Sequence, residues 1–215
     1  MSDRIDQLLA AIRSSPCPYA RSGRYVLGAE WSGTFADPSS LDRLASVLGG
    51  ESGKRGTDRA DTVIAVSYHP GVEPTCHHLS RMLLKCLSGL RERDSLAATR
   101  LAAELSHRRE TWDFTFGAVR YFVPVFSSSY RPDHSRKWDM ADSTVLLFQP
   151  EYAFRRFRIS SGRPDRRLLS EQVLARFSER GRPYPIETVT IWPKASRFVK
   201  PERDEDGPIH WWLSE

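Results

Sequence analysis

Residues 62–68 read Thr-Val-Ile-Ala-Val-Ser-Tyr, a continuous run of β-prone side chains. Such a run is typical of a central strand that is buried on both faces. A long amphipathic helix is predicted after it, from about Pro74 to Arg91, because its apolar residues recur at helical spacing. A buried strand followed by a long helix favours a fold in which helices cover a central sheet.

The sequence predicts further helices and strands on both sides of this unit. Upstream, it predicts a short amphipathic helix over 5–12 and one or two strands within 25–35. A second helix is predicted to begin at Ser39, with Asp42 completing a capping box, and to end at Gly49-Gly50. Downstream, it predicts a helix over 95–108, a hairpin over 112–126 interrupted at Pro124, a strand over 143–149, a helix over 168–180 and a strand over 187–192. The expected fold is α/β or α+β: one domain over residues 1–215, built on a mixed sheet of about five strands flanked by helices. Residues 195–215 are expected to form an irregular C-terminal tail.

The composition narrows the class of protein. A chain of 215 residues with 40% hydrophobic and 27% charged residues is typical of one globular domain. No apolar run approaches the roughly 20 residues that a membrane-spanning helix needs, and the first residues lack the apolar core of a secretory signal. The three cysteines are too few for a disulfide framework. We therefore expect a cytoplasmic protein with no membrane partner.

The positive charge is concentrated in one part of the chain. Residues 131–182 hold twelve Arg or Lys and seven Asp or Glu, an excess equal to the net charge of +5 of the whole chain. A basic region attracts phosphate, carboxylate or nucleic acid. Acidic residues are mixed among the basic ones, so nucleic acid is not the favoured partner. The alternative is an ordinary solvated face of an arginine-rich protein.

Two residues in predicted loops are candidates for chemistry. Cys17 lies between two prolines, where a thiolate in a stiff turn could ligate iron or act as a nucleophile; the alternative is a half-buried cysteine that fills a turn. His134 shares its loop with Arg131 and Arg136, whose charges would keep it neutral, as a ligand or base requires. The alternative is an ordinary exposed histidine.

Other cysteines and histidines are weaker candidates. Cys76, His77 and His78 are consecutive, and helical neighbours diverge by about 100°, so they cannot converge on one ion within a helix. Cys86 falls in the apolar stripe of the long helix and is expected to pack as a small hydrophobic residue. His69 ends the central strand, where open sheets collect their ligands, although a histidine that simply ends a strand is the more common case.

Several short motifs occur together in a recognisable order. They are Pro16-Cys17-Pro18, the aromatic hairpin Trp112-Asp-Phe-Thr-Phe-Gly117, the strand Tyr121-Phe-Val-Pro-Val-Phe126, Ser135-Arg136 and the strand end Phe148-Gln-Pro150 with Phe154 behind it. In this order and spacing, over roughly residues 14–160, the chain resembles the YqcI/YcgG family.

The resemblance implies a function. Characterised members of that family are haem-dependent N-oxygenases that hydroxylate a guanidine or amine nitrogen of an amino-acid-like substrate. The resemblance therefore implies haem b, dioxygen, an external reductant from an unidentified electron donor and a small amino-acid-like substrate. Cys17, or alternatively His134, would hold the iron, and Arg131, His134 and Arg136 would contact the haem propionates or a substrate carboxylate.

Two other functions remain open at the level of sequence. Ser127-Ser128 stands where the N-oxygenases have His-Pro, so the chain could be a catalytically silent member of the family, acting as a homodimer or as the partner of another enzyme. Alternatively, it could be a binding module that recognises an anionic partner through its basic region, residues 131–182.

Overall fold

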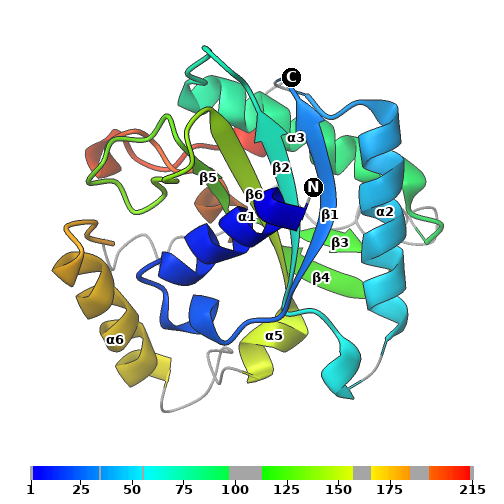
Figure 1. The fold of residues 1–215 in the computed structure, drawn as a ribbon, viewed down its shortest axis with the longest axis horizontal. Coiled ribbons are helices and arrows are strands. Elements are labelled where there is room, and N and C mark those ends of the chain that lie inside the picture. Colours follow the sequence, from blue (N-terminus) through cyan, green and yellow to red (C-terminus); the bar gives the residue numbers. More distant parts are fainter. Residues whose placement is uncertain are drawn as a thin grey trace.

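The computed structural model of the chain describes residues 2–33, 35–54, 56–96, 113–156, 166–184 and 194–213. They form a single α/β domain in which helices flank a mixed sheet of six strands (Figure 1). The predicted fold class is confirmed, with one strand more than expected.

The sheet places the predicted central strand in its interior. Its strands are β1 (Tyr25–Ser32), β2 (Thr62–Tyr68), β3 (Phe114–Phe116), β4 (Val119–Phe122), β5 (Val125–Ser127) and β6 (Ser143–Pro150). The order is β1-β2-β6-β4-β3, and β5 also pairs with β6. β1 and β2 are parallel, whereas the other pairs are antiparallel. Six of the seven residues of β2 are buried, as its continuous apolar run predicts.

The predicted hairpin is present, and its second strand is interrupted where Pro124 was expected to disturb it. β3 and β4 pair around a turn at Gly117, whose φ of 56° suits glycine. Phe122 pairs with Gln149 and Val125 with Leu146, so β4 and β5 follow β6 in one register. Pro124 keeps contact across the gap, because its carbonyl accepts from Leu147 N–H at 3.2 Å.

Helices cover both faces of the sheet. They are α1 (Ser2–Ser14), α2 (Pro38–Gly53), α3 (Cys76–Arg93), α5 (Glu151–Arg156) and α6 (Arg166–Glu179), with short 3-10 helices η1 (Pro18–Arg21), η2 (Gly56–Asp58), η4 (Lys194–Arg197), η5 (Asp204–Asp206) and η6 (Trp211–Leu213). Figure 1 shows α1 crossing one face, while α2 and α3 lie against the other. No helix in the described parts of the chain has both the length and the apolar character that crossing a bilayer requires.

The ends of α2 differ from the prediction. Its N-cap is Asp37, whose side chain accepts from Ser40 N–H at 3.0 Å, so the capping box at Ser39 and Asp42 is wrong. The helix also continues through Gly49-Gly50 to Gly53. The buried carboxylate of Glu51 accepts from Ala60 N–H at 2.7 Å, a tertiary contact that stabilises the last turn.

Alternation along the strands divides the apolar core into two layers. On β2, Val63 and Ala65 face the cluster formed with α2 and α3, whereas Ile64 and Val66 face the smaller cluster beneath α1. We call these the α3-side and α1-side clusters. Buried on both faces, the sheet is the rigid frame from which the loops project.

The C-terminal segment, residues 194–213, belongs to the α3-side cluster. Ala195, Phe198, Val199 and Trp211 are buried there, and Phe198 stacks on Trp211 with ring centroids 5.7 Å apart. The carbonyl of Phe198 accepts from Val125 N–H at 2.8 Å, at the edge of β5. The segment is irregular as expected, apart from its 3-10 turns, yet it completes the core. The helix predicted over 95–108 and the strand predicted over 187–192 lie mostly or wholly outside the described residues.

Candidate functional site

The loop between β5 and β6, residues 128–142, carries three of the four predicted site residues: Arg131, His134 and Arg136. Two tight turns fold it back, because Arg131 O accepts from His134 N–H and His134 O accepts from Lys137 N–H, both at 3.0 Å. Ser127 then bonds to the returning chain, donating to Arg136 O at 3.1 Å. The loop is therefore tied to β5, and the side chains of residues 134–136 are buried.

His134 lies buried within this loop and is not the ordinary exposed histidine of the alternative reading. Its ring stacks on Tyr130, with centroids 4.2 Å apart and planes 13° from parallel. Burial is the largest cause that lowers the pKa of His134, to about 4, and the positive charges of Lys200 and Arg136 act in the same direction. The backbone of Pro201 and the carboxylate of Asp133 have smaller, opposite effects. His134 is therefore neutral at physiological pH.

Arg136 is a buried cation. Its residue is 3% exposed, and its guanidinium lies over the ring of Phe126 at 4.9 Å. Nη2 donates to the carbonyl of Arg197 at 2.8 Å and more weakly to the hydroxyl of Tyr184 at 3.4 Å. Among the described residues, none offers Arg136 a carboxylate within ion-pair distance, and its buried Nε–H has no acceptor.

A second buried cation lies beside Arg136. Lys200 is 2% exposed, and its Nζ lies 3.8 Å from the centroid of the Tyr184 ring and 3.3 Å from Ser135 Oγ. Tyr184 thus contacts both cations, and the carbonyl of Lys200 accepts from the hydroxyl of Tyr130 at 2.8 Å. Shared contacts join five residues, which we call the cationic cluster: Tyr130, His134, Arg136, Tyr184 and Lys200.

Arg131, the third predicted contact residue, lies outside this cluster. Its guanidinium is exposed and pairs with Asp133 at 2.9 Å. Other arginines of the basic region are also paired: Arg182 with Asp139, and Arg156 with the buried Asp61. Three arginines of the basic region are thus paired with carboxylates, whereas the buried Arg136 faces none among the described residues.

Cys17 lies apart from His134. Its carbonyl accepts from Ala20 N–H at 3.0 Å, and the half-buried residue packs against the α1-side cluster. His134 stacks on Tyr130, which belongs to the α3-side cluster. The structure thus places the two alternative iron ligands against opposite sides of the sheet.

His134 does not fit an iron ligand in this arrangement. A metal-bound histidine coordinates through one ring nitrogen and donates a hydrogen bond with the other. Here Nδ1 accepts from Arg136 N–H at 3.1 Å, so a neutral ring carries its proton on Nε2 and has no free lone pair there. The space beneath the aromatic hairpin is also filled, because Phe114, Tyr121 and Phe148 pack at centroid distances of 6.0–6.4 Å. His134 therefore gives no step through haem.

The remaining cysteines and histidines form no metal site within the described residues. Cys76, His77 and His78 occupy the first turn of α3, where consecutive side chains diverge. Cys76 donates to the carbonyl of Lys200 at 3.4 Å, and burial is the largest cause that raises its pKa, to about 11. Cys86 is buried in the apolar stripe, as predicted, and burial raises its pKa to about 12.

His69 belongs to a buried chain of polar groups. Its Nδ1 lies 2.8 Å from the carbonyl of Val72, which can only accept, so Nδ1 carries the proton. In the neutral ring Nε2 must then accept from Thr144 Oγ1, at 2.9 Å. Thr144 in turn lies 2.9 Å from Ser127 Oγ, and Ser127 lies 2.9 Å from Ser129 Oγ. The chain satisfies each buried group and ties β6 to β5.

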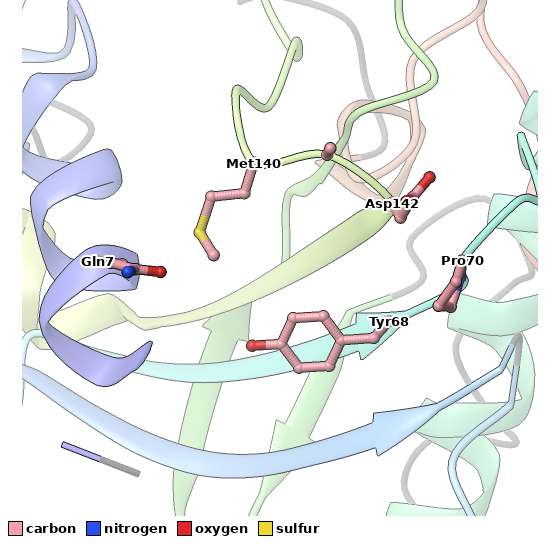
Figure 2. Close-up of a pocket in the computed structure, with 6 residues that line it drawn as sticks. Gln7, Tyr68, Pro70, Met140 and Asp142 are labelled. Atoms are coloured by element: carbon pink, nitrogen blue, oxygen red, sulfur yellow. The ribbon is translucent and has the colours of Figure 1, made fainter. Parts of the chain in front are cut away.

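A separate, open pocket of about 390 Å³ lies where β2 ends, between α1 and the loop that enters β6. Figure 2 shows Gln7, Met140 and Tyr68 around it, with Pro70 and Asp142 at its far side. Tyr68 donates from its hydroxyl to Glu30 at 2.9 Å, and Asp142 holds a φ of 49°. The charged residue that lines this pocket is Asp142, so the pocket does not suit an anion. None of the predicted site residues lines it.

In comparisons with family models, curated proteins and solved structures, nothing matches this chain. The resemblance to the YqcI/YcgG family and the haem-dependent N-oxygenation that it implies therefore stay predictions from sequence motifs. Three members of the cationic cluster were not candidates in the sequence: Tyr130, Tyr184 and Lys200. Lys200 lies in a charge-rich tail, and no local pattern indicates that it would be buried.

Proposed function

We propose that this protein is a binding module for a small anion, which it holds at the cationic cluster. The observation that supports this proposal is the buried guanidinium of Arg136, which has no carboxylate partner among the described residues. The sequence led us to expect an anionic partner for the basic region, residues 131–182, and this region contributes His134 and Arg136 to the cluster. Binding an anion requires no catalytic group, so this role is also compatible with a catalytically silent protein.

The energetics of a buried charge favour a bound anion. Removing a cation from water costs several kcal/mol unless a partner compensates it. The ring of Phe126 and the carbonyl of Arg197 offset part of this cost for Arg136. Lys200 adds a second positive charge on the same tyrosine ring, and like charges repel. An anion beside the guanidinium of Arg136 would offset the cost that remains for this side chain.

Burial also indicates the size of the ligand. Arg136 and Lys200 are almost inaccessible, so the sugar-phosphate backbone of a nucleic acid could not reach both of them. At the surface of the basic region, Arg131 is paired with Asp133 and Arg182 with Asp139. A small carboxylate or phosphate is the ligand that this arrangement suits.

The test is thermal unfolding in sodium phosphate and in sodium chloride at equal ionic strength. Phosphate at about ten times its Kd should raise the Tm of the wild type by roughly 3 °C. Arg136→Gln should lose this shift, whereas the matched surface variant Arg131→Gln should keep it. A single-stranded oligonucleotide should give no comparable stabilisation.

A second measurement does not depend on a variant that folds. In a ¹H–¹⁵N spectrum of the wild type, the Nε–H signal of Arg136 should shift and saturate as phosphate is added. Equal Tm values in phosphate and chloride, together with an Arg136 signal that does not move, would overturn the proposal. Stabilisation by the oligonucleotide alone would overturn the restriction to small anions.

A further inference from the structure

The hydroxyl groups of Thr144, Ser127 and Ser129 extend from the ring of His69 to the loop 128–142, and we call them the hydroxyl chain. Each link is 2.9 Å long, and all members are buried except Ser129, which is half-buried. A hydroxyl has one proton to donate, so the direction of one link fixes the direction of the next. The protonation state of His69 therefore sets the direction of the whole chain.

The neutral ring gives the chain one direction. Nδ1 of His69 donates to the carbonyl of Val72 at 2.8 Å, so Nε2 holds a lone pair and accepts from Thr144. Thr144 then accepts from Ser127, and Ser127 accepts from the hydroxyl of Ser129. Ser127 Oγ also accepts from Ser129 N–H at 3.3 Å. In this state the oxygen of Ser129 offers only lone pairs to the solvent.

The protonated ring requires the opposite direction. Because Nδ1 already holds a proton, the second proton goes to Nε2, which then donates to Thr144 Oγ1. Thr144 must donate to Ser127, and Ser127 must donate to Ser129, whose own proton then points toward water. Every link is kept in both directions, so neither state leaves a buried hydroxyl without an acceptor.

We propose that the hydroxyl chain is a pH-sensitive switch: protonation of His69 reverses its hydrogen bonds, and Ser129 becomes a donor at the surface of the loop. The proton comes from the solvent and forms the N–H bond at Nε2, while the hydroxyl groups only rotate. A ring that is 4% exposed is thereby coupled to a hydroxyl that solvent reaches. By linkage, a hydrogen-bond acceptor bound at Ser129 favours protonation of His69. This inference does not depend on the anion site.

The surroundings of His69 leave the direction of the chain to the proton on its ring. The two hydrogen-bond partners of the ring are uncharged. The neighbouring carboxylates are the exposed Glu73, in the turn after β2, and the exposed Asp142, whose carbonyl accepts from His69 N–H at 2.8 Å. At the outer end, Lys137 donates to a backbone carbonyl of the loop at 2.6 Å. Within the described segments, the ring of His69 forms no ion pair.

Removing the outermost hydroxyl distinguishes a reversible chain from a static one. In the neutral state Ser129→Ala takes a donor from Ser127, which still accepts from the backbone N–H of residue 129. In the protonated state the same substitution removes the acceptor of a buried hydroxyl. Ser129→Ala should therefore weaken proton binding by His69 about fivefold, although two hydroxyl groups separate it from the ring.

Ser128→Ala is the matched control. It removes a neighbouring half-buried hydroxyl, which accepts from Ser143 N–H at 3.2 Å and lies outside the hydroxyl chain. Proton binding by His69 should be the same in this variant as in the wild type. An effect as large as that of Ser129→Ala would show that the loop, and not the hydroxyl chain, is coupled to the ring.

Proton binding would be measured by titrating the His69 ring in long-range ¹H–¹⁵N spectra of the wild type and both variants. The wild type should show the Nδ1–H tautomer at about pH 8 and, in acid, a folded protein with both ring nitrogens protonated. Three results would overturn the proposal: an Nε2–H tautomer, unfolding before His69 takes up its proton, or equal proton binding by the wild type and Ser129→Ala.

Discussion

The Nε2 of His69 lies 2.9 Å from Oγ1 of Thr144, and this contact orients a buried chain of hydroxyl groups. Because Nδ1 of His69 donates to Val72, each hydroxyl donates in turn toward the imidazole, from Ser129 through Ser127 to Thr144. The chain joins the end of β2 to β5 and β6. Its first member, Ser129, is half-buried, while the other three are buried.

Replacing the central hydroxyl of this chain should destabilise the fold. Thr144→Val keeps the shape but removes both the donor to His69 and the acceptor for Ser127, so we expect the free energy of unfolding to fall by about 1–3 kcal/mol. The control, Ser129→Ala, removes only the half-buried end and should cost less than about 0.5 kcal/mol. Urea denaturation of both variants measures the difference, and equal values would show that the chain contributes nothing as a unit.

Acid should destabilise the protein through His134. Its pKa in the folded protein is lowered to about 4, below the value of about 6.5 in an unfolded chain. Between these values the unfolded chain binds more protons, so the free energy of unfolding falls as the pH decreases. From pH 7 to pH 5 this loss should be roughly 2 kcal/mol. His134→Gln should lack this part of the pH dependence, and phosphate should reduce it in the wild type, because a bound anion raises the pKa of the ring.

Haem binding is checked by adding haemin to the purified protein. We expect any Soret band to be the same in the wild type and in His134→Gln, because Nε2 of His134 carries a proton and cannot ligate iron. Cys17→Ala provides the parallel comparison for the thiol. A wild-type Soret band that is lost in either variant would restore the N-oxygenase implied by the sequence resemblance.

Asp61 should be a large single contributor to stability at the start of β2. It is buried, accepts from Arg24 N–H at 2.9 Å and pairs with Arg156 of α5. Asp61→Asn should lower the free energy of unfolding by about 2–3 kcal/mol, because it removes the charge that both arginines face. Asp42→Asn is the matched control: its pair with Arg93 is mostly exposed, and we expect less than about 1 kcal/mol. Similar losses in the two variants would contradict this ranking.

Two glycines should respond to alanine with opposite signs. A Cβ on Gly28 would lie 2.5 Å from Leu44 Cδ1 and 2.7 Å from Val63 Cγ1, so Gly28→Ala should cost about 1–3 kcal/mol. A Cβ on Gly49 would meet nothing within 4 Å inside α2, so Gly49→Ala should stabilise the protein by about 0.5–1 kcal/mol. Thermal unfolding measures both, and a stabilising Gly28→Ala would mean that α2 does not approach β1 so closely.

A comparison of α2 with β2 and α3 shows where sequence patterns predict the structure correctly and where they do not. β2 and α3 are predicted correctly because continuous apolar runs and helical periodicity are local signals that burial reinforces. The end of α2 is predicted wrongly. Gly49-Gly50 is typical of a helix end, but α2 continues to Gly53, and the contact between Glu51 and Ala60 stabilises its last turn. Local patterns cannot register such a contact.

The candidate site could also be predicted only where its features depend on local sequence. Arg136 and His134 could be selected from their loop, and the neutral state of His134 was expected from its arginine neighbours. The charges that keep it neutral, however, come from Arg136 and Lys200, while Arg131 is bound to Asp133 at the surface. Lys200 reaches the loop only because the C-terminal segment packs across β5, a tertiary contact without a sequence signature.

That packing has a consequence for biosynthesis. The sheet can pair as soon as β6 emerges from the ribosome, but the hydrophobic layer behind it lacks Phe198 and Trp211 until much later in translation. Until then the nascent chain exposes the apolar side of β5 and its unpaired edge, a surface that chaperones recognise and other chains can pair with.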